Sequence, residues 1–281
     1  MKKTAIAILI AVLVVVIGGT LLCAGLSAVH FDFRKLDRTQ YVTNTYDFTD
    51  PVQRIDVKGY TADVELLAAE NGGCRVVSEE SDREKYTVAL DNGTLTIRPA
   101  NNVKAWSLFS FKSPRISVYL PAGSYELLKA VMGTGDVTAD KALVFGAVDV
   151  EISTGDLTLN GVQADKVTAH GSTGDIRLSD MTPGTVDVSV STGKIVLTNV
   201  VCSGDLRCES TTGDIRLTDV DGANLYLKAS TGDITGTVRT PKTFLAHAST
   251  GSVRVPVAAG DGRCEAQTST GDIKLSVSGN D

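Results

Sequence analysis

The chain has few of the residues on which enzymes and nucleic-acid-binding proteins depend. Its 281 residues include one tryptophan, three histidines and 5% aromatic residues, and its formal net charge is −6. A negative chain has no electrostatic basis for holding phosphate backbones, so we expect no nucleic-acid partner. No serine or cysteine forms a recognisable constellation with histidine, as nucleophilic catalysis requires. We therefore expect a protein that is not an enzyme and that needs no cofactor.

Charged residues are missing from one long stretch at the N-terminus, between Thr4 and Val29. About 20 apolar residues cross a bilayer as a helix, so this stretch is long enough. A cleaved signal peptide is the alternative, because Lys2 and Lys3 form a suitable n-region. The apolar run exceeds the usual ~7–15 residues of such a peptide, and no Ala-x-Ala site follows. We favour an uncleaved, single-pass transmembrane anchor over residues 1–30, with the rest of the chain on the extracytoplasmic side of the cell membrane.

The second half of the chain repeats a four-residue phrase, Ser-Thr-Gly-Asp or a near copy of it. The phrase occurs eight times at intervals of 19 or 20 residues. Its glycines are Gly135, Gly155, Gly174, Gly193, Gly213, Gly232, Gly251 and Gly271. So steady a period indicates one supersecondary unit stacked on itself.

Apolar residues occupy alternate positions on both sides of these glycines. The residues two places after the glycines are all aliphatic: Val137, Leu157, Ile176, Ile195, Ile215, Ile234, Val253 and Ile273. Those five places before, from the second unit on, are Val150, Ala169, Val188, Cys208, Leu227, Ala246 and Ala266. A period of two indicates strands with one buried face. The sequence thus predicts an all-β fold, a parallel β-solenoid of about eight 19–20-residue coils over residues 133–281, stacked in sequence order.

The residues between the anchor and the repeats have a different pattern. Residues 31–50 are mixed polar and aromatic without a clear period, and we expect a juxtamembrane linker. Residues 51–132 contain short β-like runs, and we expect a β-rich N-terminal cap. Within it, residues 61–66 resemble the repeat without its glycine and predict a degenerate first coil, because arrays need atypical terminal units. Asp91-Asn92-Gly93 between two such runs predicts a β-hairpin.

The N-terminal anchor, the Ile-Ser-Val-Tyr-Leu-Pro run at 116–121 and the tandem Ser-Thr-Gly-Asp coils carry a family resemblance. Together they resemble the bacterial "putative adhesin" β-strand-repeat family, a domain of unknown function. The resemblance covers residues 50–281. It implies a membrane-anchored or surface-exposed solenoid, and some relatives suggest a link to envelope-stress systems. The family supplies no catalytic residues to carry over.

One column of acidic residues follows the repeated glycines and is the first candidate site. Its members are Asp136, Asp156, Asp175, Asp214, Asp233 and Asp272. Stacked carboxylates are candidate calcium ligands, since calcium takes six to eight oxygens. The alternative, which we favour, is that glycine supplies positive φ and aspartate bonds the turn backbone. Arg177, Arg216, Arg254 and Lys274, two places further on, can neutralise the column.

An aromatic cluster is the second candidate site, containing Trp106, Phe109 and Phe111. It either plugs the N-terminal end of the solenoid or contacts a membrane surface or ligand.

The remaining histidines and cysteines predict neither a metal site nor a disulfide. His170 and His247 share an outward column four coils apart. Cys208 and Cys264 lie in interior columns three coils apart, about 14 Å, which is too far for a disulfide.

These features predict a non-enzymatic, adhesin-like interaction or scaffold module on the cell surface. Its expected partners are the membrane, through the N-terminal helix, and a protein or cell-wall component. The open edge of the last coil suggests end-to-end self-association. An accessory regulator of an envelope-stress signalling system is the alternative. We rank a polysaccharide-acting enzyme last, because the regular columns show no local cluster of carboxylates.

Overall fold

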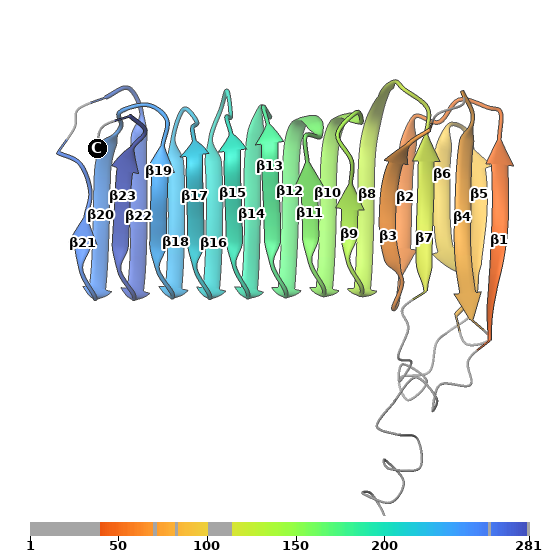
Figure 1. Ribbon diagram of the computed structural model, residues 1–281, viewed down its shortest axis with the longest axis horizontal. Helices are drawn as coiled ribbons and strands as arrows, with labels where there is room; N and C mark the ends of the chain where they lie inside the picture. Colours follow the sequence, from red (N-terminus) through yellow and green to blue (C-terminus); the bar gives the residue numbers. More distant parts are fainter. Residues whose placement is uncertain (1–39, 70–71, 82–83, 101–113, 258–259, 280–281) are drawn as a thin grey trace, which may run out of the picture.

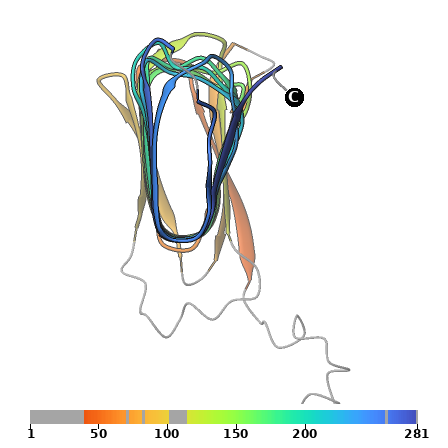
Figure 2. The same ribbon diagram turned by 90° about the vertical axis from the view of Figure 1, so that its left-hand side faces the viewer.

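Two long β-sheets that face each other make up the protein (Figure 1, Figure 2). The computed structural model describes residues 40–69, 72–81, 84–100, 114–257 and 260–279, and all regular structure in these ranges is β. Sheet A has 12 strands and sheet B has 11.

The strands of sheet A, in spatial order, are β1 (Tyr41–Phe48), β4 (Cys74–Ser81), β7 (Arg115–Leu120), β3 (Asp63–Ala68), β9 (Val137–Ala139), β11 (Leu157–Asn160), β13 (Ile176–Met181), β15 (Ile195–Val200), β17 (Ile215–Val220), β19 (Ile234–Val238), β23 (Ile273–Val277) and β21 (Val253–Arg254). Those of sheet B are β5 (Tyr86–Asp91), β6 (Thr94–Pro99), β2 (Arg54–Gly59), β8 (Ser124–Thr134), β10 (Val144–Thr154), β12 (Gln163–Thr173), β14 (Thr185–Thr192), β16 (Leu206–Thr212), β18 (Leu225–Thr231), β22 (Arg263–Thr270) and β20 (Thr243–Thr250).

Each coil of the solenoid contributes one strand to sheet B and the next to sheet A. Equivalent strands of neighbouring coils pair in parallel, so that Val148 lies opposite Val167 and Val150 opposite Ala169. These four side chains are buried between the sheets. Burial of each large aliphatic side chain stabilises the fold by about 1.5–3 kcal/mol. The alternating columns therefore form the core, and the predicted parallel β-solenoid is confirmed.

The N-terminal end of the solenoid is built differently from the repeats. β2 pairs with β8 and β3 with β9, so residues 54–68 form a coil ahead of the first Thr-Gly-Asp corner. Further strands then extend both sheets, and β5 and β6 form the hairpin predicted from the sequence. Its turn residues Asn92 and Gly93 have φ values of 48° and 75°, as an Asn-Gly hairpin requires.

The segment expected as a linker, residues 31–50, is a strand in its second half. β1 pairs with β4 in antiparallel register. Tyr46 and Phe48 pack against the core, and the burial of these two side chains stabilises the strand.

The last two coils are not stacked in sequence order, which corrects the predicted arrangement. β22 lies between β18 and β20, and β23 lies between β19 and β21. The final coil is therefore internal, and the open edge belongs to the preceding coil. Pro256 follows β21 closely and gives a physical reason, because proline cannot donate a ladder hydrogen bond and is confined to edge strands.

This insertion changes two spacings predicted from the sequence. Cys208 and Cys264 are two coils apart instead of three, and both are buried free thiols. His170 and His247 are five coils apart instead of four.

A buried ion pair lies where the chain passes from β19 to β20. Lys242 Nζ lies 2.8 Å from Asp221 Oδ1, with both side chains nearly inaccessible. Asp221 also accepts hydrogen bonds from the Gly222 N–H and the Thr240 hydroxyl. A buried pair of this kind is costly to break by removing one partner, since the other charge would be left uncompensated.

Two sequence predictions fall outside the described residues. They are the transmembrane anchor at residues 1–30 and the aromatic cluster of Trp106, Phe109 and Phe111. Within the described ranges no helix has the length and apolar character needed to cross a bilayer.

Candidate functional site

The corner of each coil accepts only glycine at its turning point. At Gly193 the φ angle is 145°, and an added Cβ would lie 1.9 Å from the Gly174 carbonyl oxygen. Neighbouring corners repeat this contact, for example between Gly174 and Gly155. Successive corners are therefore stacked at backbone contact, which brings the residues that follow the glycines into one straight column.

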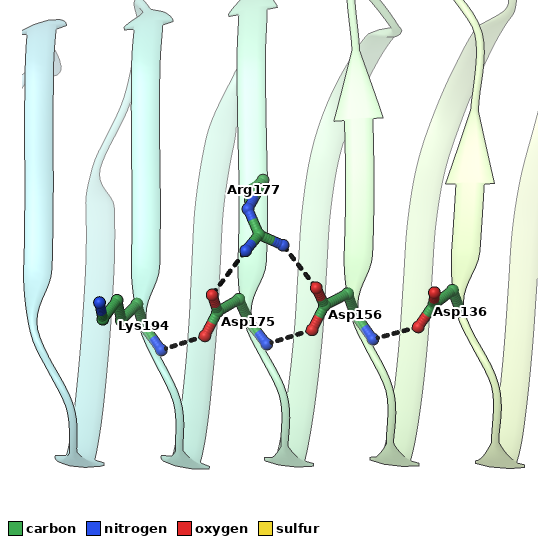
Figure 3. Close-up of polar contacts among 5 residues, drawn as sticks. All are labelled: Asp136, Asp156, Asp175, Arg177 and Lys194. Carbon is green, nitrogen blue, oxygen red and sulfur yellow. Dashed lines mark hydrogen bonds and ion pairs between the residues drawn. The ribbon is translucent and has the colours of Figure 1, made fainter. Parts of the chain in front are cut away.

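Each of the aspartates Asp136, Asp156 and Asp175 links its own coil to the next by accepting a backbone N–H (Figure 3). Oδ1 of Asp136 accepts the N–H of Asp156, Oδ1 of Asp156 accepts that of Asp175, and Oδ1 of Asp175 accepts that of Lys194, each at 2.8 Å. Asp63 begins the series by accepting the Asp136 N–H at 3.0 Å. One carboxylate oxygen of each of these aspartates is thus committed to the ladder, which is interrupted at Lys194 because this residue has no carboxylate.

Several of the second carboxylate oxygens are paired with cations. Arg177 bridges Asp156 and Asp175 at 2.6 Å each (Figure 3). Arg216 binds Asp214 at 3.0 Å, and Lys274 binds Asp272 at 2.6 Å. Calcium would have to displace these partners. Across the described ranges no group of three histidine, cysteine or acidic side chains is placed to hold a metal ion.

These contacts lower the pKa values of two aspartates in the column, Asp156 and Asp272. Burial alone would raise the pKa of Asp156, but the N–H of Asp175 and the Arg177 guanidinium together hold it below its ordinary value. Lys274 and the Ser252 N–H lower the pKa of Asp272 strongly. Both groups are therefore anionic near neutral pH, in keeping with a role in the turn.

The two histidines of the described ranges, His170 and His247, belong to no group of potential metal ligands. His170 Nδ1 lies 2.7 Å from Ser189 Oγ, and His247 is in the edge strand β20.

The outer face of sheet B has a depression that the sequence did not single out. It has a volume of about 140 Å³ and is lined by side chains from three neighbouring coils: Arg207, Glu209, Tyr226, Lys228, Glu265 and Gln267. The Arg207 guanidinium lies 4.8 Å from the centre of the Tyr226 ring, and Lys228 Nζ lies 2.6 Å from Glu209 Oε1. The inserted β22 supplies Glu265 and Gln267, so a sequence-ordered stack would not have formed this group.

The far end of the solenoid exposes apolar side chains. Leu245 is 50% exposed and Val253 is 42% exposed, and the inward-facing Phe244 and Ala246 of β20 are only partly buried. Among the described residues no strand pairs with the outer side of β20 or β21. The open edge is therefore not on the last coil, where stacking in sequence order would place it.

Comparisons with solved structures show the same fold elsewhere. A "putative adhesin" from Bacteroides fragilis NCTC 9343 is 15% identical with a TM-score of 0.56, over 84% of this chain and 97% of that one. A "putative adhesin" from Parabacteroides distasonis ATCC 8503 is 13% identical with a TM-score of 0.43, over 85% of this chain and 98% of that one. No curated protein matches the chain.

The family is shown by a match over most of the sequence. The model described as Toastrack DUF4097, a domain of unknown function, matches residues 52–281. This range takes in the N-terminal cap strands from β2 onward as well as every Thr-Gly-Asp coil. The chain therefore belongs to the Toastrack DUF4097 family.

Proposed function

We propose that this protein is a membrane-anchored, extracytoplasmic, adhesin-like module that binds partners and does no catalysis. One observation carries the proposal: Tyr41 and the open β20–β21 edge lie at opposite ends of the solenoid (Figure 1). Strand spacing of about 4.8 Å across 11 strands makes the body roughly 50 Å long. An anchor at residues 1–30 would leave the open edge far from the membrane and free to meet a partner.

Two surfaces are available for this role. The first is the outer face of sheet B around the depression at Tyr226. The second is the β20 edge, whose unpaired backbone groups suit pairing with another strand and whose sequence has no Lys, Arg, Asp or Glu to oppose it. A second copy of the chain is a suitable occupant of this edge, since two β20 strands can meet in antiparallel register.

Crosslinking in intact cells tests the proposal. A photo-crosslinking residue is placed in the full-length chain at Leu245 on the edge, at Gln267 in the depression, or at Thr218 on sheet A as a control. We expect crosslinks to external proteins, cell-wall material or a second copy from the first two positions, and few from Thr218. Crosslinks confined to cytoplasmic proteins would contradict the proposed location. Equal crosslinking at all three positions would contradict the proposed surfaces.

A further inference from the structure

We propose that the depression on sheet B binds a carboxylate-bearing sugar residue of an acidic polysaccharide. This inference names the partner class of the proposed function and rests on it. It depends on three observations: a cation without a protein partner, a ring that holds this cation in place, and polar groups arranged around both.

Arg207 is the cation. Its side chain is exposed, and within the described part of the chain it makes no hydrogen bond or ion pair. Its guanidinium stacks at 4.8 Å over the Tyr226 ring, which orients the side chain and leaves its N–H donors free. A planar guanidinium with free donors matches a carboxylate in bidentate geometry. The arrangement is therefore preorganised for a carboxylate group.

The other charges around the depression are already neutralised. Lys228 pairs with Glu209 at 2.6 Å, and Arg263 pairs with Glu265 at 3.1 Å. These pairs leave Arg207 as the cation of the lining that makes no ion pair. Its register partner in β14, Asp187, is likewise exposed and unpaired within the described ranges, so a ligand carboxylate has to compete with Asp187 for the guanidinium. Gln267 is exposed at its rim and offers both a donor and an acceptor to sugar hydroxyls.

The size of the depression limits how much of a ligand it can hold. Its volume of about 140 Å³ lies far below the ~300–1,000 Å³ of pockets that enclose whole small molecules. It fits one ring of a longer chain whose remaining residues lie along the flat sheet. A polysaccharide presents such rings in series, and weak single contacts then add by multivalency.

The inserted coil is what builds this surface. Glu265 and Gln267 are opposite Tyr226 and Lys228 only because β22 pairs with β18. In a sequence-ordered stack Leu245 and His247 would be their neighbours, by the column positions of β20. The change of order thus places two polar side chains beside the Arg207–Tyr226 pair.

Calorimetry with the full-length chain in detergent micelles tests the proposal. The probes are tetrasaccharides of galacturonate, of mannuronate, and of alternating glucuronate and N-acetylglucosamine, together with methyl-esterified galacturonate. We expect at least one acidic probe to bind and the methyl ester to bind at least about tenfold more weakly, because a hydrogen bond to a charged group contributes about 1.5–3 kcal/mol.

Four variants locate the site. Arg207→Gln and Tyr226→Leu should each weaken binding about tenfold or more, whereas Tyr226→Phe keeps the ring and should bind normally. Arg216→Gln, on sheet A of the same coil, is the matched control and should bind as the parent does. Circular dichroism confirms that each variant is folded.

Three results would overturn the inference: no binding of any acidic probe, unchanged binding by Arg207→Gln, or equal binding of the methyl ester. Each of these leaves the proposed function standing if the intact-cell crosslinks at Leu245 and Gln267 still reach external partners. Loss of those crosslinks with sugar binding intact would instead contradict the proposed display at the surface.

Discussion

At the scale of single residues, the corner glycines carry a steric requirement that can be tested directly. Gly193→Ala would place a Cβ 1.9 Å from the Gly174 carbonyl oxygen at a φ of 145°. Strained backbone of this kind costs about 1–3 kcal/mol before any clash is counted. We expect the free energy of unfolding to fall by at least about 2 kcal/mol in urea titrations.

Gly123→Ala is the matched control for this substitution. Its added Cβ would meet no atom within 4 Å, and its φ lies outside the strained range. We expect an unfolding midpoint close to that of the parent. Equal midpoints for both variants would show that the corner tolerates a side chain.

The aspartate ladder predicts a loss of stability in acid. The pKa of Asp156 is lowered in the folded chain, so its contribution is present above the unfolded pKa of about 3.9. That contribution is lost as the pH falls through the depressed folded pKa. Asp156→Asn keeps an acceptor for the Asp175 N–H but removes the charge beside Arg177. We expect this variant to be less stable than the parent at pH 7, with a smaller difference at pH 3, in paired urea titrations.

Asp187→Asn serves as the comparison for that experiment. The Asp187 side chain is exposed on sheet B and, within the described ranges, makes no hydrogen bond or ion pair. Because no hydrogen bond or ion pair is lost, its substitution should leave the free energy of unfolding close to that of the parent. If it matches Asp156→Asn at both pH values, the ladder is not the source of the acid sensitivity.

The sequence predicted that cations neutralise the aspartate column, but it did not predict that the aspartates bond from one coil to the next. Arg177, Arg216 and Lys274 neutralise aspartates as predicted, whereas Arg254 makes no ion pair within the described ranges. The sequence predicted that each aspartate bonds the backbone of the turn. In the structure the bonded N–H belongs to the turn of the next coil. Sequence period alone does not say how closely successive corners approach, and this approach depends on the glycine contacts.

At the scale of elements, the order of the last coils has a direct chemical test. Lys228 and Gln267 are register partners in β18 and β22, and both point outward. Neighbouring strands are about 4.8 Å apart, within reach of a disulfide. We expect the double variant Lys228→Cys with Gln267→Cys to form this bond under mild oxidation, as read by mass spectrometry of peptides. Lys228→Cys with His247→Cys should not, because β22 lies between these strands; the opposite pair of results would restore sequential stacking.

The sequence predicted the hairpin and the coils, but it did not predict the order in which the last two coils are stacked. Local turn chemistry fixes the hairpin, and columns of apolar residues fix the parallel pairing, whichever coil is the neighbour. Because repeated coils present similar inward faces, pairing alone does not select one order. Pro256 was the available signal, since it cannot belong to an internal strand. The depression beside Tyr226 depends on this order and was for that reason not predictable from the columns.

At the scale of the whole molecule, the two ends of the solenoid differ. Antiparallel strands such as β1 and β5 extend the N-terminal end, whereas the described chain leaves β20 and β21 open at the other. An unprotected edge strand without Lys, Arg, Asp or Glu, such as β20, favours pairing with further strands. Two copies joined through β20 would place their N-terminal ends roughly 100 Å apart, twice the length of one body. With the proposed anchors at such separated ends, contact between two membranes is favoured over contact within one.

This geometry predicts that the full-length chain brings membranes together. Vesicles carrying the chain with the solenoid outside should aggregate, as followed by light scattering. Ala246→Lys should abolish aggregation, because an inward-pointing charge blocks edge pairing. Ala246 is only partly buried, so the lysine can reach water past the open end and the fold is retained.

Thr218→Lys adds the same charge to the exposed face of sheet A and should leave aggregation unchanged. If both variants aggregate vesicles like the parent, the contact does not involve the β20 edge. If both prevent it, added charge alone is responsible. A parent chain that stays dispersed at every surface density would remove self-association between membranes, and the β20 edge would then require a partner other than this chain.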